Sequence, residues 1–459
     1  MRVIVCGAGR VGSSIAAYLA EEDNDVTLID TEASLISQIN ETLDVTGIVG
    51  FAAHPDVLEK AGAQDADMII AATQEDEVNM VACQVAHSLF DLPKKVARVR
   101  EETYLAPEWA NLFSRDHMPI DYVISPESEV AKAIANRIRV PGAFNIIPLA
   151  DNKVQLVSVL AKTDCPLINT PLRHLTNLFP DLSIEILAII RGQKRIIPSS
   201  EDEICPGDEV YFVTASDHLQ RAMAAFGCKV EESARRIIIV GCGNIGLQLA
   251  KNIQNNYPGI TARVIENNFE RAQYVSQQLD KTIVLHGDGL SREILDEANV
   301  GLCEAVIAVT DHDETNVLVS LLSKEYGCER AITLINNPAY TPIVSSLGVD
   351  AIVSPRAITV STILQHIRKG RIRSVHSLRD GFAEVIELVA LDTSAVINKP
   401  LKILDFPEGV ILGAIVRDEE IIAPRPETVI KPNDLVILLA SHEQVRKVEQ
   451  FFAVSPEYF

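Results

Sequence analysis

The segments RVIVCGAGRVG (residues 2–12) and RIIIVGCGNIG (residues 236–246) decide the fold of this chain. In each, an apolar run leads directly into three glycines with the spacing Gly-x-Gly-x-x-Gly, and a helix is predicted to follow. The first glycine permits a tight turn, the second lets the backbone approach a pyrophosphate, and the third allows close packing of helix on strand. Both segments therefore predict a parallel sheet of the kind that binds nucleotides.

The two halves of the chain resemble each other well beyond these loops. AATQEDEVNM (71–80) corresponds to AVTDHDETNV (308–317), and ICPGDEVYFV (204–213) corresponds to VIKPNDLVIL (429–438). Repetition in this order indicates that the whole chain of 459 residues is a duplication of one long unit.

Each unit has two parts. The first part alternates apolar strands, such as residues 3–6 and 68–72, with helical stretches, which is typical of a parallel sheet with right-handed crossovers. The second part has short strands separated by Pro and Gly turns, and helices near 127–139 and 357–368 join the parts. The predicted fold class is α/β, with two tandem Rossmann-like, doubly wound parallel-sheet domains, each followed by a small α+β domain. The predicted domains are residues 1–123, 142–228, 233–352 and 372–459.

Composition excludes several functional classes. A net charge of −22 weighs against nucleic acid and against adhesion to anionic lipid. No apolar segment reaches the roughly 18 to 20 residues that span a bilayer, so we expect a cytoplasmic chain. The eight cysteines form no CxxC pair, and Cys6 and Cys242 are interpreted as small buried apolar residues.

An acidic residue ends the second strand of each half. Asp30 lies 23 positions after Gly7, and Glu266 ends the segment ARVIE. A carboxylate there accepts hydrogen bonds from both ribose hydroxyls and repels a 2′-phosphate, so NAD is favoured over NADP. The candidate cofactor-binding residues are Gly7, Ala8, Gly9, Arg10, Val11, Gly12, Asp30, Thr73, Gln74 and Arg98 in the first half, and Gly241, Cys242, Gly243, Asn244, Ile245, Gly246, Glu266 and Thr310 in the second.

The two candidate sites are not identical. Arg10 is replaced by Asn244, which removes one charge directed at phosphate, and Arg98 has no arginine counterpart in AITLIN. We expect the first site to grip a dinucleotide more firmly. The repeated acidic-Asn signature of Asp76, Glu77 and Asn79 has two open interpretations, a helix cap or a ligand contact.

Residues for catalysis are missing from the repeat. No histidine is duplicated, there is no GxxxxGK[ST] loop, and no cluster has metal-ligand spacing. We therefore predict a protein without catalytic residues or metal. An NAD-dependent oxidoreductase and a stand-alone nucleotide-sensing scaffold remain as alternatives.

Taken in order, the repeated glycine loop, the AATQEDEVN and AVTDHDETN segments and the trailing PGDEV or PNDLV module resemble the RCK (KTN) domains, which regulate potassium conductance and transport. The resemblance covers essentially the whole chain. It implies a peripheral regulator on the cytoplasmic face of the inner membrane, with a separate potassium-translocating membrane subunit as partner. It also implies a homo-oligomeric ring of four chains that responds to NAD(H), ATP or ADP.

The resemblance also assigns roles to residues. It gives the pyrophosphate to residues 7–11 and 241–245, the ribose to Asp30 and Glu266, and further contacts to Thr73, Gln74, Arg98 and Thr310. One departure is Gly50-Phe51, which stands where the family pattern, kept as Gly287-Asp288 in the second half, has Gly-Asp.

Overall fold

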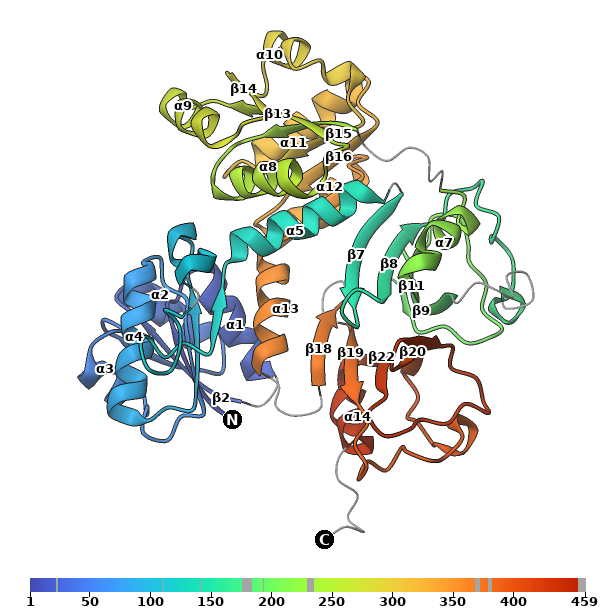
Figure 1. Cartoon of the computed structure of the whole chain (residues 1–459), viewed down its shortest axis with the longest axis horizontal. Helices are drawn as coiled ribbons and strands as arrows, with labels where there is room; N and C mark the ends of the chain where they lie inside the picture. The colour runs from blue at the N-terminus through green and yellow to red at the C-terminus, as the bar shows by residue number, and fades with distance from the viewer. Residues whose placement is uncertain are drawn as a thin grey trace. The chain divides into compact units, whose positions relative to one another are not determined.

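The computed structural model describes residues 1–21, 24–109, 111–140, 142–175, 184–192, 194–228, 235–367, 372–378 and 382–452 (Figure 1). Within these ranges the strands form four sheets, two with six strands and two with five. The α/β class is confirmed.

The first sheet is parallel, with the strand order β3-β2-β1-β4-β5-β6. Its strands are β1 (Arg2–Cys6), β2 (Asp25–Asp30), β3 (Thr46–Val49), β4 (Met68–Ala71), β5 (Lys94–Arg98) and β6 (Tyr122–Ile124). The helices between them are α1 (Arg10–Glu21), α2 (Ala33–Thr42), α3 (Pro55–Lys60) and α4 (Asp76–Phe90). The order reverses between β1 and β4, so the sheet is doubly wound and has its topological switch point there.

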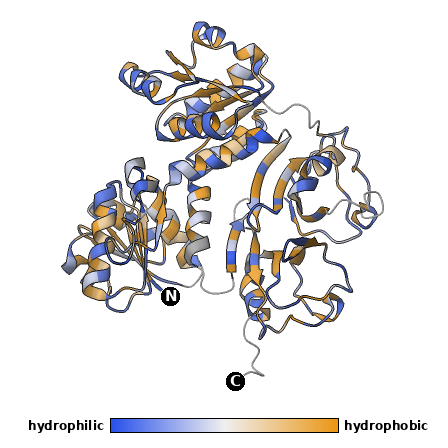
Figure 2. Ribbon diagram, viewed as in Figure 1, coloured by the Kyte–Doolittle hydropathy of each residue, from blue (hydrophilic) through white to orange (hydrophobic). Residues whose placement is uncertain are grey.

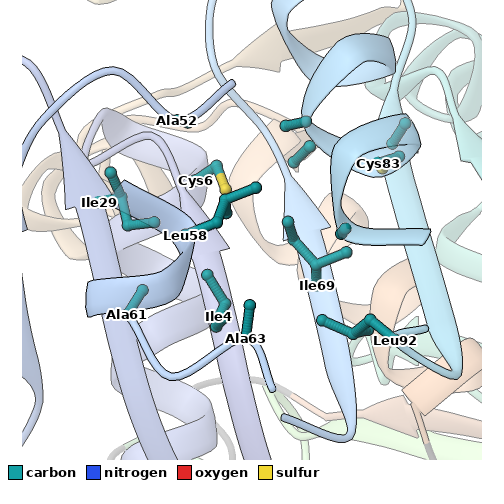
Figure 3. Close-up of a cluster of buried hydrophobic side chains, with 14 of the residues drawn as sticks. Ile4, Cys6, Ile29, Ala52, Leu58, Ala61, Ala63, Ile69, Cys83 and Leu92 are labelled. Carbon is teal, nitrogen blue, oxygen red and sulfur yellow. The ribbon is translucent and has the colours of Figure 1, made fainter. Parts of the chain in front are cut away.

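The core of this sheet explains its continuous apolar strands. Ile4, Cys6 and Ile69 are buried on one face, where Leu58 of α3 and Cys83 of α4 pack against them (Figure 3). Burial raises the pKa of the Cys6 thiol to about 12, so this sulfur stays protonated and behaves as a small apolar group.

The second parallel sheet repeats this topology in the order β14-β13-β12-β15-β16-β17. Its strands are β12 (Arg236–Val240), β13 (Thr261–Glu266), β14 (Ile283–His286), β15 (Ala305–Ala308), β16 (Arg330–Leu334) and β17 (Ala351–Val353). Its helices are α8 (Asn244–Asn256), α9 (Phe269–Gln278), α10 (Arg292–Glu297), α11 (Asp313–Glu325) and α12 (Thr341–Ser346). The predicted duplication of the parallel-sheet part is therefore confirmed, since the two sheets have the same strand order.

The small modules are antiparallel sheets, with the orders β10-β9-β11-β8-β7 and β18-β19-β22-β20-β21. The first contains β7 (Ala143–Leu149), β8 (Val154–Leu160), β9 (Ile184–Arg191), β10 (Lys194–Ile196), β11 (Glu209–Ala215) and α7 (Leu219–Ala225). The second contains β18 (Ile372–Ser377), β19 (Ala383–Val389), β20 (Val410–Arg417), β21 (Glu420–Ile422), β22 (Leu435–Ser441) and α14 (Val445–Phe451). Figure 2 shows hydrophobic residues concentrated on the long strands of these sheets.

The two antiparallel sheets pack on each other. Leu156 and Leu187 of the first module share one buried cluster with Val385 and Ile437 of the second. The approach is close at Gly413, where a Cβ would lie 2.8 Å from a methyl carbon of Val213. Period-2 patterning does not reveal this pairing, because it predicts which strand face is buried but not what covers it.

The Asp of the repeated PGDEV and PNDLV turns is structural. Asp208 and Asp434 are buried, and each accepts two hydrogen bonds from an arginine across the sheet, Arg191 and Arg417, at 2.8–2.9 Å. Each carboxylate also accepts the backbone N–H three residues before it, at 2.7 Å. The pair therefore fixes the turn that feeds the last long strand.

The chain forms two compact units, and each unit consists of two segments that are separated in the sequence. One comprises residues 1–130 and 354–366, and the other comprises residues 131–353 and 367–459. Helix α13 (Pro355–Ile367), which follows the second parallel sheet in sequence, thus belongs to the unit of the first. Helix α5 (Pro126–Arg139) begins in the first unit and ends in the second. The four domain boundaries remain predictions.

Removal of Asp434 should destabilise the last module strongly. Asp434→Ala removes the buried carboxylate that holds the partly exposed Arg417 and the turn, and the cost expected for losing these charged hydrogen bonds is about 2 kcal/mol. Hydrogen exchange of the β22 amides, followed by mass spectrometry, should accelerate accordingly. The control is Glu427→Ala, which removes an exposed pair with Lys402 and should change exchange little. Equal effects of the two variants would contradict the structural role.

Acid should act on the second small module through His376. This side chain is buried in β18, and desolvation lowers its pKa from 6.5 to about 4. The unfolded chain then binds the proton more readily between these values, so stability falls as pH drops through this window. From pH 7 to pH 5 the linked loss is about 2 kcal/mol.

His376→Leu should remove that acid-sensitive contribution. Glu185 in β9 acts in the opposite direction, because burial raises its pKa from 4.5 to about 7 and protonation at low pH then favours the folded state. His376→Leu keeps the contribution of Glu185 and loses that of His376. Denaturant unfolding at pH 7 and pH 5 should therefore show that the free energy of unfolding of His376→Leu rises relative to that of the parent when the pH is lowered. An unchanged difference between the two pH values would refute this assignment.

Candidate functional site

The first glycine loop has the geometry that the spacing predicts. Gly7 adopts φ = 103°, and a Cβ there would lie 2.9 Å from the carbonyl oxygen of Ala72, which directly follows the neighbouring strand β4. A Cβ on Gly12, inside α1, would collide with the carbonyl oxygen of Gly7. Around Gly9, by contrast, the space is open, and α1 begins at the following residue. The loop thus presents an uncovered backbone at a helix N-terminus, where anions bind favourably.

The second loop repeats each of these features. Gly241 has φ = 91°, and a Cβ there would lie 2.8 Å from the backbone nitrogen of Thr310. A Cβ on Gly246 would collide with the carbonyl oxygen of Gly241, whereas Gly243, the N-cap of α8, has open space around it. Both halves therefore retain a loop shaped for close approach of a phosphate.

The predicted ribose carboxylates lie directly beside these loops. Asp30 accepts the backbone N–H of Ala8 at 2.6 Å, and Glu266 accepts that of Cys242 at 2.7 Å. The other oxygen of each carboxylate accepts an N–H at the start of the following turn, at 2.9 Å. These bonds hold the loop and the carboxylate together, and each oxygen retains a second lone pair for a ligand hydroxyl.

The repeated Thr-to-Asn segment is a structural tie. The hydroxyl of Thr73 donates to Oδ1 of Asn79 at 2.7 Å, and the amide of Asn79 donates to the carbonyl of Arg98 at 3.0 Å. Thr310 and Asn316 make the same bonds, with Leu334 as the acceptor. The asparagine therefore joins the ends of two neighbouring strands at the carboxyl edge of the sheet.

The capping interpretation of the acidic residues is wrong. Neither α4 nor α11 has a side-chain cap, and Asp76 and Asp313 lie inside their helices. Instead, Asp76 accepts the backbone N–H groups of residues 100 and 101 at 2.8 Å, and Asp313 accepts those of residues 336 and 337 at 2.8–2.9 Å. The carboxylates hold the loops after β5 and β16, a tertiary role that local sequence does not reveal.

Gln74 and Arg98 are placed differently from the rest of the candidate set. The side chain of Gln74 is exposed, and the backbone carbonyl of Gln74 accepts a hydrogen bond from the side chain of Arg100. The guanidinium of Arg98 donates to Glu127 in the first turn of α5, at 2.8 Å. Arg98 and Val11 of the glycine loop line one small cavity in the first unit, so Arg98 does lie near the first loop.

The second loop has a cation that the sequence comparison missed. Arg271, in the first turn of α9, donates from Nε to the carbonyl of Cys242 at 2.8 Å, and its guanidinium lies 5.2 Å from the ring centroid of Tyr274. Arg271 therefore places a positive charge beside the second loop, in which Asn244 stands at the position of Arg10. The aligned position in the first half is Leu35, so no repeated residue signals this arginine.

In the part of the chain that the structure describes, no three His, Cys, Asp or Glu side chains gather so as to hold a metal ion. The same residues include no helix with the length and apolar character needed to cross a bilayer.

The comparisons with known proteins agree with this architecture. The chain matches the TrkA-N domain at residues 3–126 and 237–355, and the TrkA-C domain at residues 156–227 and 385–453. Among solved structures, the GsuK RCK domain superposes with a TM-score of 0.62 at 17% identity, covering 98% of this chain and 94% of the other. The GsuK channel bound to NAD superposes with a TM-score of 0.62 at 16% identity, covering 98% and 78%. At this identity the likeness establishes the fold, a tandem RCK architecture.

Relatives named Trk system potassium uptake protein TrkA align along the full length. The protein of Azorhizobium caulinodans is 48% identical over 459 residues and that of Halomonas elongata 39% identical over 463 residues, with 100% of both chains covered in each case. That of Vibrio alginolyticus is 40% identical, with 99% of both chains covered. The chain belongs to the family of Trk system potassium uptake proteins TrkA. Family and fold together support a regulatory role in potassium transport.

Loss of Arg271 should weaken the second site selectively. Arg271→Ala removes a guanidinium beside the loop, and we expect about tenfold weaker binding of ADP there, because hydrogen bonds to charged groups contribute about 1.5–3 kcal/mol. Isothermal titration in an Asp30→Ala background isolates the second site. Arg292→Ala, an exposed arginine on α10, is the matched control and should leave binding unchanged. Identical affinities for both variants would remove Arg271 from the site.

Proposed function

We propose that this chain is the nucleotide-sensing gating subunit of a Trk-type potassium uptake system. It acts on the cytoplasmic face of the inner membrane and controls a separate potassium-translocating membrane subunit. The observation that carries this proposal is the pairing of an open glycine loop with a carboxylate in both halves. The neighbouring polar side chains of Asp76, Asn79, Asp313 and Asn316 are occupied by structural bonds.

The candidate ligands are NAD(H), with ATP and ADP as alternatives. Asp30 and Glu266 favour a free ribose hydroxyl over a 2′-phosphate. The residues proposed for the first site are Gly7, Ala8, Gly9, Arg10, Val11, Gly12, Asp30, Thr73, Gln74 and Arg98. Those proposed for the second site are Gly241, Cys242, Gly243, Asn244, Ile245, Gly246, Glu266 and Thr310, to which we add Arg271. The NAD-bound GsuK channel supports a nucleotide as the ligand class.

The mechanism that we propose is a population shift. A ligand moves an equilibrium between two conformations only through its differential affinity for them. Two sites per chain add their effects, and several chains in one assembly add more. No step of catalysis is needed, and NADH incubated with the protein should keep its absorbance.

Assembly into a homo-oligomeric ring, which we propose to contain four chains, fits the surface of the parallel-sheet modules. Val81 on α4 and Leu318 on α11 occupy equivalent positions and are 45% and 50% exposed, although both are large apolar residues. Trp109, in the same module as Val81, is 60% exposed. Apolar side chains that recur at the same exposed place in both copies support contacts with other chains.

Nucleotide binding is tested by isothermal titration of the full chain with NAD⁺, NADH, ATP and ADP. Asp30→Ala should abolish one class of site and Glu266→Ala the other, because each change removes both the ribose acceptor and the loop tie. Asp44→Ala, an exposed carboxylate in the first module, is the control and should leave both classes intact. No binding by the parent chain would overturn the proposal.

The regulatory role is tested with the membrane partner. Liposomes that contain a Trk-type pore should take up potassium in a manner that depends on this chain and on nucleotide. Liposomes that contain this chain alone should show no flux. Potassium flux through this chain alone, or turnover of a nicotinamide cofactor with a metabolite, would contradict a gating subunit.

A further inference from the structure

The ion pair between Arg98 and Glu127 is built differently from the arginine–aspartate pairs of the two small modules. Arg98 ends β5 and Glu127 lies in the first turn of α5, and both belong to the first compact unit. Their side chains are only 18% and 14% exposed, and a single bond of 2.8 Å joins them. Arg191 and Arg417, by contrast, bind their aspartates through two nitrogens each.

One hydrogen-bonding atom of each side chain in this pair has no partner among the described residues. Nε of Arg98 and Oε2 of Glu127 are buried and lack a hydrogen-bond partner among the described residues. Guanidinium and carboxylate normally pair through two parallel bonds, and a buried polar atom without a partner costs about 1–3 kcal/mol. The pair is therefore held in a geometry that leaves donor capacity on Arg98 for another acceptor.

Arg98 and the first glycine loop line the same small cavity. Arg98 lines it together with Val11 of that loop, Pro126 of α5 and Thr359 of α13, all in the first unit. The N-terminus of α1 and the guanidinium thus lie at the same edge of the sheet, and both attract negative charge.

The second half of the chain folds without this pair. Asn79 and Asn316 mark equivalent positions, since their amides donate to the carbonyls of Arg98 and Leu334 respectively. Helices α5 and α13 each begin at a proline, so Arg356 in the second half occupies the position that Glu127 has in the first. Leucine and arginine cannot form an ion pair, so the pair is not a requirement of the module.

We propose that Glu127 is a built-in competitor of the nucleotide phosphate for Arg98. In the empty first site the carboxylate holds the guanidinium. A phosphate-bearing nucleotide on the loop at residues 7–12 takes over Arg98, and Glu127 is released. This inference rests on the proposed function and concerns the first site only.

The exchange links ligand charge to a connecting element. Glu127 lies in the first turn of α5, and the later residues of this helix belong to the second unit. Release of its only described partner loosens that turn. The nucleotide would thus bind with different affinity to the conformation that has the Arg98–Glu127 pair and to the one that lacks it, as a population shift requires.

The test uses the full chain in a Glu266→Ala background, so that ADP reports on the first site. Glu127→Gln removes the competing charge, and we expect ADP to bind about fivefold more tightly. Arg98→Gln should weaken ADP binding. Adding Glu127→Gln to this variant should have no further effect, because the guanidinium for which Glu127 competes is then absent. Asp116→Asn, an exposed carboxylate of the same module, is the control and should leave affinity unchanged.

A second measurement needs no variant at Glu127. Hydrogen exchange of the peptide covering residues 124–139 should accelerate when ADP binds, and should respond less in Arg98→Gln. The competition would be overturned if the background chain binds ADP, Glu127→Gln binds it no more tightly, and hydrogen exchange of residues 124–139 does not change. The proposed function would still stand in that case. Absence of ADP binding by the background chain and by the parent would overturn the proposed function itself.

Discussion

The close packing of a helix glycine against a loop carbonyl in each parallel-sheet module is the constraint on which the rest depends. Gly12 on α1 lies against the carbonyl of Gly7, and Gly246 on α8 lies against that of Gly241, with no space for a side chain. This contact sets the position of the helix N-terminus relative to the sheet, and so exposes backbone N–H groups at the switch point between β1 and β4. Any larger residue would push the helix away and dismantle the site before a ligand arrives.

Around this contact, most polar residues of the carboxyl edge serve the architecture. Asn79 ties two strand ends together, and Asp76 holds the loop after β5, with identical arrangements in the second half. Such groups resemble a catalytic or binding constellation in sequence, because buried structural polar groups and functional ones are the same residue types. Their hydrogen bonds distinguish them, since a fully partnered carboxylate has little capacity left for a substrate.

The differences between the halves lie where this shared framework allows variation. The first half places Arg98 beside its loop and restrains it with Glu127. In the second half Arg271 reaches across the loop from α9. Both halves therefore have an arginine near the glycine loop, although different elements carry it.

The amino-acid sequence alone determined the two glycine loops, the carboxylates Asp30 and Glu266, the duplication and the α/β class, because these depend on local spacing and on periodicity. The tertiary structure decided the partners of Arg98 and Arg271, the pairing of the two antiparallel sheets and the membership of α13 in the first unit. Those features join residues distant in sequence, and apolar patterning specifies that a face is buried without specifying which surface covers it.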